Sequence, residues 1–223
     1  GAVVALPPPT PGELAALAVT VAGVAAAASR RGRVAAASAG AAALVALELG
    51  ARAAGAPTGL LRVTALDVGQ GDALLVDLPD GRLVLVDGGG FVGSPIDTGE
   101  RVILPVLRMR RRRRVDVVVL SHPHPDHFGG LASALPRLEV GEFWDTGQGE
   151  ADGAGATYAG ILRRLRARGV PVRRPGELCG AHRFGGARVD VLAPCPRFLM
   201  GEGANDNSFV LRASFGGRSA LLV

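Results

Sequence analysis

The feature that most constrains the fold is an apolar run, Val115 to Leu120, that leads directly into the loop HPHPDH at residues 122–127. Four of the six residues in this run are β-branched, which is typical of a strand buried inside a sheet. A buried strand holds its end rigidly and fixes the point at which the next loop begins. The sequence therefore predicts a sheet in which one interior strand carries a histidine-rich loop at its end.

This loop holds three of the chain's four histidines, together with an aspartate and two prolines. His122 and His124 are two residues apart, so in extended backbone both imidazoles point to the same side. The prolines restrict the backbone and partly preorganise that spacing, and Asp126 and His127 follow at once. Imidazole and carboxylate groups are ligands for Zn²⁺, Mn²⁺ or Fe²⁺, and two pairs suit two neighbouring ions. We therefore expect a divalent metal site here rather than a solvated polar loop.

Short β-type runs bounded by turn residues continue from Leu60 to the last residue. Asp80 and Gly81 lie between two of these runs and predict a β-hairpin. Helices are expected after Phe128 and over residues 99–113 and 156–169. Strands mixed with helices in this way predict an α/β or α+β sandwich. The expected strands lie within residues 60–68, 73–78, 82–90, 115–122, 139–145, 187–194, 208–215 and 218–223.

Residues 1–56 differ in kind, because they form two alanine-rich apolar blocks separated by Arg30, Arg31 and Arg33. Each uncharged stretch is about 16 residues, or roughly 24 Å as a helix, a little short of the ~20 residues that span a bilayer. Alanine is only weakly favoured in lipid, so a soluble helical hairpin stays open. If residues 11–50 span a membrane, the arginines place the hinge on the cytoplasmic side and the domain of residues 57–223 on the far side.

The chain contains no lysine, and its net charge of +5 comes from arginine. A positive net charge favours binding to a polyanion or to an anionic membrane surface, but it does not identify the partner. A run of five consecutive arginines can bind phosphates through its forked guanidinium groups, although such a run is also typical of a solvated helix end. No aromatic residue interleaves with it to stack bases. The run consists of Arg110, Arg111, Arg112, Arg113 and Arg114.

The two cysteines, Cys179 and Cys195, are too few and too widely spaced for a zinc ribbon or a redox motif. We expect two independent small apolar residues rather than a disulfide. His182 lies beside a predicted hairpin turn, where we expect a surface residue rather than a metal ligand.

HPHPDHFGG resembles the H-x-H-x-D-H signature of the metallo-β-lactamase superfamily. The stretches LDVGQGDALLV, LVLVDGGG, DTGERVILPVLR and NDNSFVLRASFGGRSALLV resemble the ComEC family in particular, which comprises membrane channels for DNA uptake in bacterial competence. The resemblance runs from about Leu61 to Val223, and the two apolar blocks are similar to the family's last membrane helices. It implies an αββα sandwich joined to the rest of the channel polypeptide in the cell membrane, and the arginine hinge places this sandwich on the extracytoplasmic side.

The resemblance also implies roles for single residues. His122 and His124 would hold one metal, and Asp126 and His127 a second, with zinc or manganese as the ions. A hydroxide between the metals would be the nucleophile, and we expect catalysis to depend on Asp126. Asp72 and Asp87 would support the ligands, although simple turn chemistry also suits both. The implied reaction is cleavage of DNA phosphodiester bonds, with single-stranded DNA as partner and the non-imported strand as substrate.

Two other functions stay open. One is a superfamily hydrolase for a lactam, thioester or small phosphoester, and the other is a non-catalytic membrane-tethered module of the channel. The superfamily supplies a bridging aspartate, often in TGD, but this sequence stops at ALLV, where TGD would come next. We therefore expect a fragment of a longer protein, with its sandwich incomplete at the C-terminus. The usual third histidine of the first metal is also not visible, and Asp206 in NDNS is a possible further ligand.

Overall fold

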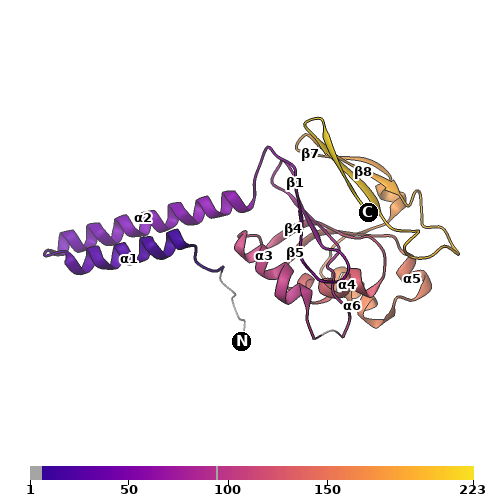
Figure 1. Ribbon diagram of the computed structural model, residues 1–223, viewed down its shortest axis with the longest axis horizontal. Helices are drawn as coiled ribbons and strands as arrows, with labels where there is room; N and C mark the ends of the chain where they lie inside the picture. The colour runs from indigo at the N-terminus through magenta and orange to yellow at the C-terminus, as the bar shows by residue number, and fades with distance from the viewer. Residues whose placement is uncertain (1–6, 94) are drawn as a thin grey trace. The chain divides into compact units, whose positions relative to one another are not determined.

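The computed structural model describes residues 7–93 and 95–223, and the chain divides into two compact units. Unit 1 comprises the residues up to Gly55 together with residues 108–112, and unit 2 comprises residues 56–107 and 113–223. Unit 1 is a helical hairpin, whereas unit 2 contains the sheets and the remaining helices (Figure 1). The domain boundary expected between residues 56 and 57 stays a prediction, and the grouping of residues 108–112 with unit 1 was not foreseen.

The hairpin of unit 1 consists of α1 (Pro11–Ala26) and α2 (Arg30–Gly55). A capping box begins α1: Thr10 Oγ1 accepts a hydrogen bond from the amide of Glu13 at 3.2 Å, and Glu13 Oε2 accepts one from the amide of Thr10 at 2.6 Å. Among the helices that the structure describes, α2 is the one long and apolar enough to cross a membrane, whereas α1 has 16 residues. Membrane crossing itself stays a prediction for both.

The two helices approach closely at Gly40 of α2, where a Cβ atom would lie 2.0 Å from Oγ1 of Thr20 in α1. We expect Gly40→Val to destabilise the hairpin by about 1–3 kcal/mol, because the added atoms force the helices apart. Thermal unfolding of the full chain in detergent, followed by the helical circular dichroism signal, would measure this loss. Gly50→Ala is the matched control, since its Cβ meets nothing within 4 Å. Equal losses in both variants would contradict the prediction.

The larger sheet of unit 2 has six strands in the order β1-β2-β3-β4-β5-β6. The first three strands are antiparallel, with the predicted hairpin at Asp80 and Gly81 confirmed between β2 and β3, and β3 to β6 are parallel. Both faces of this sheet pack against apolar side chains, which explains the nearly continuous apolar sequence of β4. The strands are β1 (Arg62–Ala65), β2 (Leu74–Asp77), β3 (Leu83–Val86), β4 (Arg114–Leu120), β5 (Glu139–Asp145) and β6 (Val172–Arg173).

The smaller sheet has four antiparallel strands in the order β10-β9-β8-β7. Three of them were expected, but β7 was not, because its sequence GAHRF lacks the alternation of apolar and polar residues that marks a strand. Pairing with β8 holds this edge strand instead. The strands are β7 (Gly180–Phe184), β8 (Ala187–Ala193), β9 (Val210–Phe215) and β10 (Arg218–Leu222).

The helices of residues 99–109, 125–137 and 155–167 pack on the face of the larger sheet that is turned away from the smaller sheet. Their apolar side chains, among them Phe128, Leu131 and Ile161, form one core with that face, and the two sheets enclose a second core around Trp144 and Phe209. Unit 2 is therefore layered as helices, sheet and sheet. The helices are a π-helical turn (Gly99–Ile103), α3 (Leu104–Met109), α4 (Pro125–Ala134), a 3₁₀ turn (Leu135–Arg137), α5 (Gln148–Asp152), α6 (Gly155–Ala167) and α7 (Pro175–Leu178).

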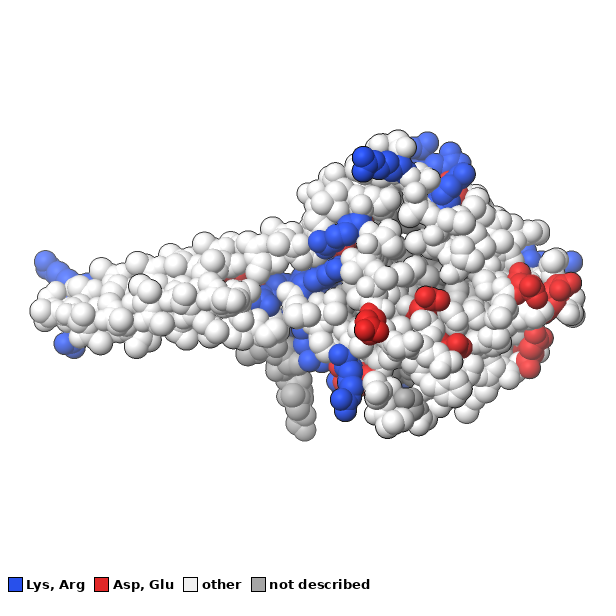
Figure 2. Space-filling model, viewed as in Figure 1, with Lys and Arg blue, Asp and Glu red and all other residues white. Residues whose placement is uncertain are grey.

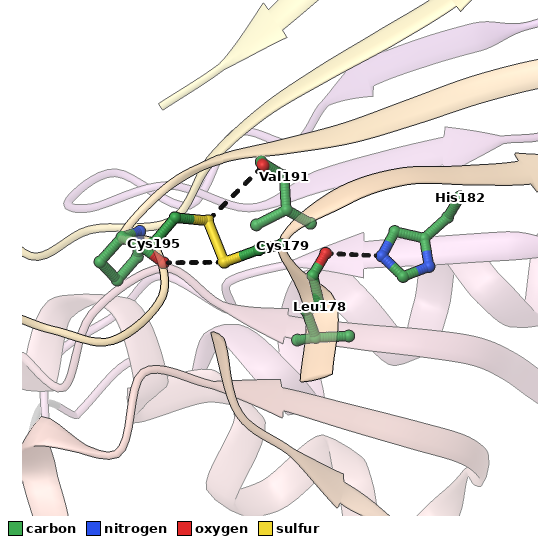
Figure 3. The surroundings of a disulfide bond; sticks show 6 residues. Leu178, Cys179, His182, Val191 and Cys195 are labelled. Atoms are coloured by element: carbon green, nitrogen blue, oxygen red, sulfur yellow. Dashed lines mark hydrogen bonds between the residues drawn. A yellow bond between two sulfur atoms is a disulfide. The ribbon is translucent and has the colours of Figure 1, made fainter. Parts of the chain in front are cut away.

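The expectation of two independent cysteines is wrong, because Cys179 and Cys195 form a disulfide with a Cα–Cα distance of 5.8 Å (Figure 3). The bond joins the end of α7 to the loop after β8. The two residues are 16 apart in sequence, so their separation gave no sign of contact, which depends on the antiparallel pairing of β7 with β8. Beside the bond, His182 Nε2 lies 2.7 Å from the carbonyl oxygen of Leu178.

We expect the double variant Cys179→Ser/Cys195→Ser to lose about 3 kcal/mol of unfolding free energy, because the unfolded chain regains the entropy of a loop of this length. Urea denaturation would measure the loss. Reduction of the wild-type protein should lower its midpoint to that of the double variant. An unchanged midpoint after complete reduction would contradict the prediction.

Candidate metal centre

Three strands of the larger sheet end at the histidine-rich loop. Val86 of β3 is paired with Val119 of β4, and Leu120 is paired with Asp145 of β5. The ends of β3, β4 and β5 therefore follow one another along the same edge of the sheet. They carry Asp87, residues 121–127 and Asp145, respectively. This is the edge at which the carboxyl ends of parallel strands meet, where open α/β sheets commonly bind their ligands.

Asp87 is the centre of a buried hydrogen-bond network. Its carboxylate accepts hydrogen bonds from the amide of Ser121 at 2.7 Å, from Ser121 Oγ at 2.6 Å and from His127 Nδ1 at 2.8 Å. The residue has a φ of 58°, a left-handed conformation that non-glycine residues seldom adopt. The sequence assigned Asp87 a supporting role, and the structure places its side chain directly behind the histidines.

The same network favours one nitrogen of His122 as the site of the ring proton. His122 Nδ1 lies 3.0 Å from Ser121 Oγ and 3.2 Å from Ser208 Oγ. Both hydroxyls donate elsewhere, Ser121 to Asp87 and Ser208 to the carbonyl of Asn205. This arrangement favours a proton on Nδ1 of His122, as the bond to Asp87 does for Nδ1 of His127. Nε2 of each ring is then an unprotonated acceptor whenever that ring is neutral, the form in which imidazole binds a metal.

The pKa values of these two histidines are shifted in opposite directions. Burial lowers the pKa of His122 to about 4, and the charges of His127 and His124 act in the same sense, so this ring is neutral at physiological pH. Burial also lowers the pKa of His127, but the hydrogen bond and charge of Asp87, with Asp126 and Asp72, raise it overall. Burial raises the pKa of Asp87, although the hydrogen bonds that its carboxylate accepts act to lower that pKa.

Glycine-rich loops fit tightly around the histidine-rich loop. A Cβ atom on Gly71, in GQGD, would lie 1.8 Å from the carbonyl oxygen of Asp126. The amide of Gly88 donates a hydrogen bond to the carbonyl oxygen of His127 at 2.7 Å. The amide of Gly90 donates one to the carbonyl oxygen of Gln70 at 3.0 Å. The motifs GQGD and DGGG therefore hold the backbone of the loop in place, which requires residues without a side chain.

The predicted ligands gather at one loop but do not enclose a common point. The ring centroid of His122 lies 4.0 Å from the ring centroid of His127 and 4.7 Å from that of His124. Asp126 lies in the first turn of α4 and acts on both His122 and His127 through its charge. Asp72 is exposed and acts on His127 in the same way. Within residues 7–93 and 95–223, no three His, Cys, Asp or Glu side chains are arranged to hold a metal ion.

The NDNS segment contacts the histidine-rich loop through Ser208 and not through Asp206, the residue that the sequence suggested. Asp206 is exposed, whereas Ser208 contacts His122 and the amide of Phe209 donates to the carbonyl of Ser121 at 2.9 Å. Asn207 holds the segment together through hydrogen bonds with Leu199. The motif itself was a sufficient signal for this segment, but its spacing did not say which side chain faces the histidines.

A second polar cluster at the same edge was not foreseen. Asp145 is fully buried and accepts hydrogen bonds from Tyr158 Oη and Arg174 Nη1, each at 2.5 Å. Gly149 packs between this cluster and the loop, because a Cβ there would lie 2.6 Å from the Tyr158 ring and 2.7 Å from Pro123. The cluster therefore supports the histidine-rich loop from the side of β5.

The arginine run does not present a continuous row of free guanidinium groups. Arg111 belongs to unit 1, where its side chain is 4% exposed and pairs with Glu48 at 2.8 Å and Glu13 at 3.0 Å. Arg114 pairs with Asp116 at 2.8 Å. Two carboxylates already bind Arg111 in a buried position, so its guanidinium is not presented as a free phosphate-binding group.

Known proteins resemble this chain over the region that contains the histidine-rich loop. A model of the metallo-beta-lactamase superfamily matches residues 66–184, more than half of the chain. ComE operon protein 3 of Bacillus subtilis (strain 168) is 33% identical over 89 residues, covering 35% of this chain and 12% of that protein. The uncharacterized protein YcaI of Escherichia coli (strain K12) is 40% identical over 70 residues, covering 31% of this chain and 9% of that protein. The matched regions are thus small parts of both relatives.

Among solved structures, Rm3 metallo-beta-lactamase has a TM-score of 0.45 and 18% identity, covering 76% of this chain and 62% of that chain. The peroxy diiron species of the chemotaxis sensor ODP has a TM-score of 0.43 and 16% identity, covering 70% of this chain and 56% of that chain. The predicted α/β sandwich is confirmed by the family match and the sheets described above. The chain belongs to the metallo-beta-lactamase superfamily of metal-dependent hydrolases, and its domain is ComEC-like.

Proposed function

We propose that unit 2 is the metal-dependent hydrolase domain of a membrane DNA-uptake channel and that it cleaves phosphodiester bonds of the strand that is not imported. The similarity to ComE operon protein 3 supports the assignment to a competence protein. The superfamily match supports hydrolysis. DNA, the membrane and the rest of the channel polypeptide are the proposed partners.

One observation carries the catalytic part of this proposal. The network through Asp87, Ser121 and Ser208 favours a proton on Nδ1 of both His122 and His127, which leaves Nε2 of each neutral ring as an acceptor. A loop that served only as a solvated turn would not need a buried carboxylate to set the protonation of two imidazoles. Such orientation from behind is typical of metal-binding histidines.

The donor chemistry fits divalent ions, although the ligands do not enclose a common point in the described structure. His122, His124, Asp126 and His127 would hold the ions, for which we propose zinc or manganese. When bound, such ions supply Lewis acidity toward a phosphoryl oxygen and lower the pKa of water. The chain's own contribution is to keep His122 neutral, to orient His127 through Asp87 and to hold the loop backbone against the glycines of GQGD and DGGG.

The cell membrane is the proposed location, with unit 2 on the extracytoplasmic side. The length and composition of α2 support membrane crossing, and the three arginines before Val34 support a cytoplasmic hinge. The disulfide between Cys179 and Cys195 supports the same side independently, because disulfides persist in oxidising compartments and are rare in the cytosol.

The test is hydrolysis by the full chain in lipid nanodiscs, first stripped of metal with a chelator and then reloaded with Mn²⁺ or Zn²⁺. Substrates are end-labelled single-stranded and double-stranded DNA, a β-lactam, a thioester and a small phosphoester. We expect cleavage of single-stranded DNA that requires the added metal. Hydrolysis of another substrate without DNA cleavage would replace the nuclease by a different hydrolase. A folded protein that binds no metal and hydrolyses nothing would leave a non-catalytic module.

A further inference from the structure

The end of unit 2 that lies opposite the histidine-rich loop is built from chain turns. The turn between β2 and β3, at residues 78–82, meets the turn between β7 and β8, since a Cβ atom on Gly185 would lie 2.5 Å from Cβ of Asp80. The turn between β9 and β10 is adjacent, with Phe215 3.6 Å from the position of a Cβ on Gly186. These turns lie at the opposite ends of their strands from Asp87 and Ser208.

Four exposed arginines surround these turns, and together they form the arginine rim: Arg82, Arg183, Arg188 and Arg218. Arg82 pairs with Asp80 at 3.0 Å, and its guanidinium carbon lies 5.0 Å from the centroid of the Phe184 ring. Arg188 pairs with Asp190 at 2.7 Å. Arg183 and Arg218 have no acidic partner among the described residues. The rim thus keeps an excess of positive charge, and Figure 2 shows basic side chains gathered over the smaller sheet.

The opposite end of unit 2, around the histidine-rich loop, is acidic. Figure 2 shows acidic side chains over α5 and its surroundings. Three arginines, Arg166, Arg174 and Arg197, also lie at this end; Arg174 pairs with Asp145 and Glu150, and Arg166 pairs with Glu150. The carboxylates outnumber them. The acidic residues that are exposed or partly exposed at this end are Asp67, Asp72, Asp126, Glu150, Asp152, Glu202 and Asp206.

The rim also lies where the chain enters unit 2 from α2. Residues 56–61 join the end of α2 to the start of β1, and six residues reach at most about 20 Å when extended. The amide of Gly59 donates to the carbonyl of Pro79 at 2.8 Å, so this linker contacts the turn between β2 and β3. The apolar side chains of Leu60 and Val63 are each 39% exposed beside it. A bilayer crossed by α2 would therefore be close to this end.

We propose that the arginine rim docks on anionic lipid headgroups and turns the histidine-rich loop away from the bilayer. This rests on the proposed membrane crossing by α2. Anionic lipid attracts arginines that lie near its surface and repels the acidic end of the same unit. The short linker keeps the rim within reach of the headgroups, and the exposed Leu60 and Val63 suit the boundary between headgroups and acyl chains. A substrate strand would then approach the loop from the side away from the membrane.

The test uses the full chain in nanodiscs of phosphatidylcholine, with or without phosphatidylglycerol. Both native cysteines are in the disulfide, so a new cysteine can be labelled selectively with a fluorophore. Ser219→Cys reports the rim end and Met200→Cys, where the native side chain is 89% exposed, reports the opposite end. Lipids with a nitroxide on the headgroup quench a label that lies close to the surface.

We expect phosphatidylglycerol to increase quenching of the label at position 219 but not at position 200. About 1 M salt, where the Debye length is ~3 Å, should remove the increase. The double variant Arg183→Glu/Arg218→Glu should lower docking at least about fivefold, since one basic residue near anionic lipid contributes about that factor. Arg163→Glu/Arg164→Glu on α6 makes the same charge change at two exposed residues and should leave docking unchanged.

Equal quenching in both lipids, equal loss in the two double variants, or absence of the chain from the nanodiscs would overturn the proposal. If charge reversal of the rim instead removes binding of single-stranded DNA without changing the lipid response, the rim is a nucleic-acid surface and the proposal is wrong. Cleavage measured on the same samples separates this inference from the proposed function. Lipid-dependent docking without cleavage would overturn the nuclease and leave the docking intact.

Discussion

Asp126→Ala is expected to lower metal-dependent hydrolysis by at least about 100-fold and to reduce the amount of bound metal. Loss of a residue that merely supports a metal ligand typically costs 10–100-fold, so loss of a ligand should cost more. Asp126 lies in the first turn of α4, and its charge already acts on His122 and His127. Alanine removes that charge as well as two oxygen donors. Initial rates with excess metal, together with the metal content of the purified chain, would measure both effects.

The fold should survive this change, because Asp126 is only partly buried and makes no side-chain hydrogen bond among those described. Glu202→Ala is the matched control: it also removes a carboxylate from the acidic end of unit 2, but from an exposed side chain. It should leave the rate within about twofold, as surface substitutions usually have small effects. Full activity of Asp126→Ala with normal metal content would show that the reaction does not depend on this loop.

The sequence was most informative where local pattern and tertiary structure demand the same residues. The β-branched run of β4 is apolar because both faces of its sheet are covered, so periodicity predicted the strand and the position of the loop. Asp80 and Gly81 specified a hairpin through the conformations that a tight turn requires. Gly71 and the glycines after Asp87 were visible as motifs, although the contacts that require them appear only in three dimensions.

The features that were missed depend on residues that are distant in sequence. Ser208 meets His122 across 86 positions, through the placement of β9 beside β8. The Asp145 cluster depends on Arg174, 29 positions away. The arginine run gave no sign that Arg111 is the member that pairs with Glu13 and Glu48. In each case, residue type and spacing suggested a chemistry but did not determine the partner.

Asp87→Asn should lower metal affinity about 10–100-fold while leaving the chain folded. The asparagine oxygen can still accept the hydrogen bond from the Ser121 amide. Its NH₂ group must then face Ser121 Oγ and His127 Nδ1, where the carboxylate previously accepted. A donor opposite Nδ1 favours the tautomer of His127 that carries its proton on Nε2, and a protonated nitrogen cannot bind a metal. We therefore expect the variant to impair the ligand atom itself rather than the position of the ring.

Two measurements separate this mechanism from simple destabilisation. Competition with a chromophoric chelator gives the metal affinity, and ¹⁵N NMR of the histidine rings reports which nitrogen of His127 carries the proton. Asp190→Asn is the control, because Asp190 is also buried, at 3% exposure against 1% for Asp87, but pairs with Arg188 and Arg212 on the smaller sheet. It should lower stability and leave metal affinity unchanged. If Asp87→Asn kept both the affinity and the Nδ1 proton, Asp87 would only hold the backbone of the loop, and the orientation of the imidazoles would have to come from the metal.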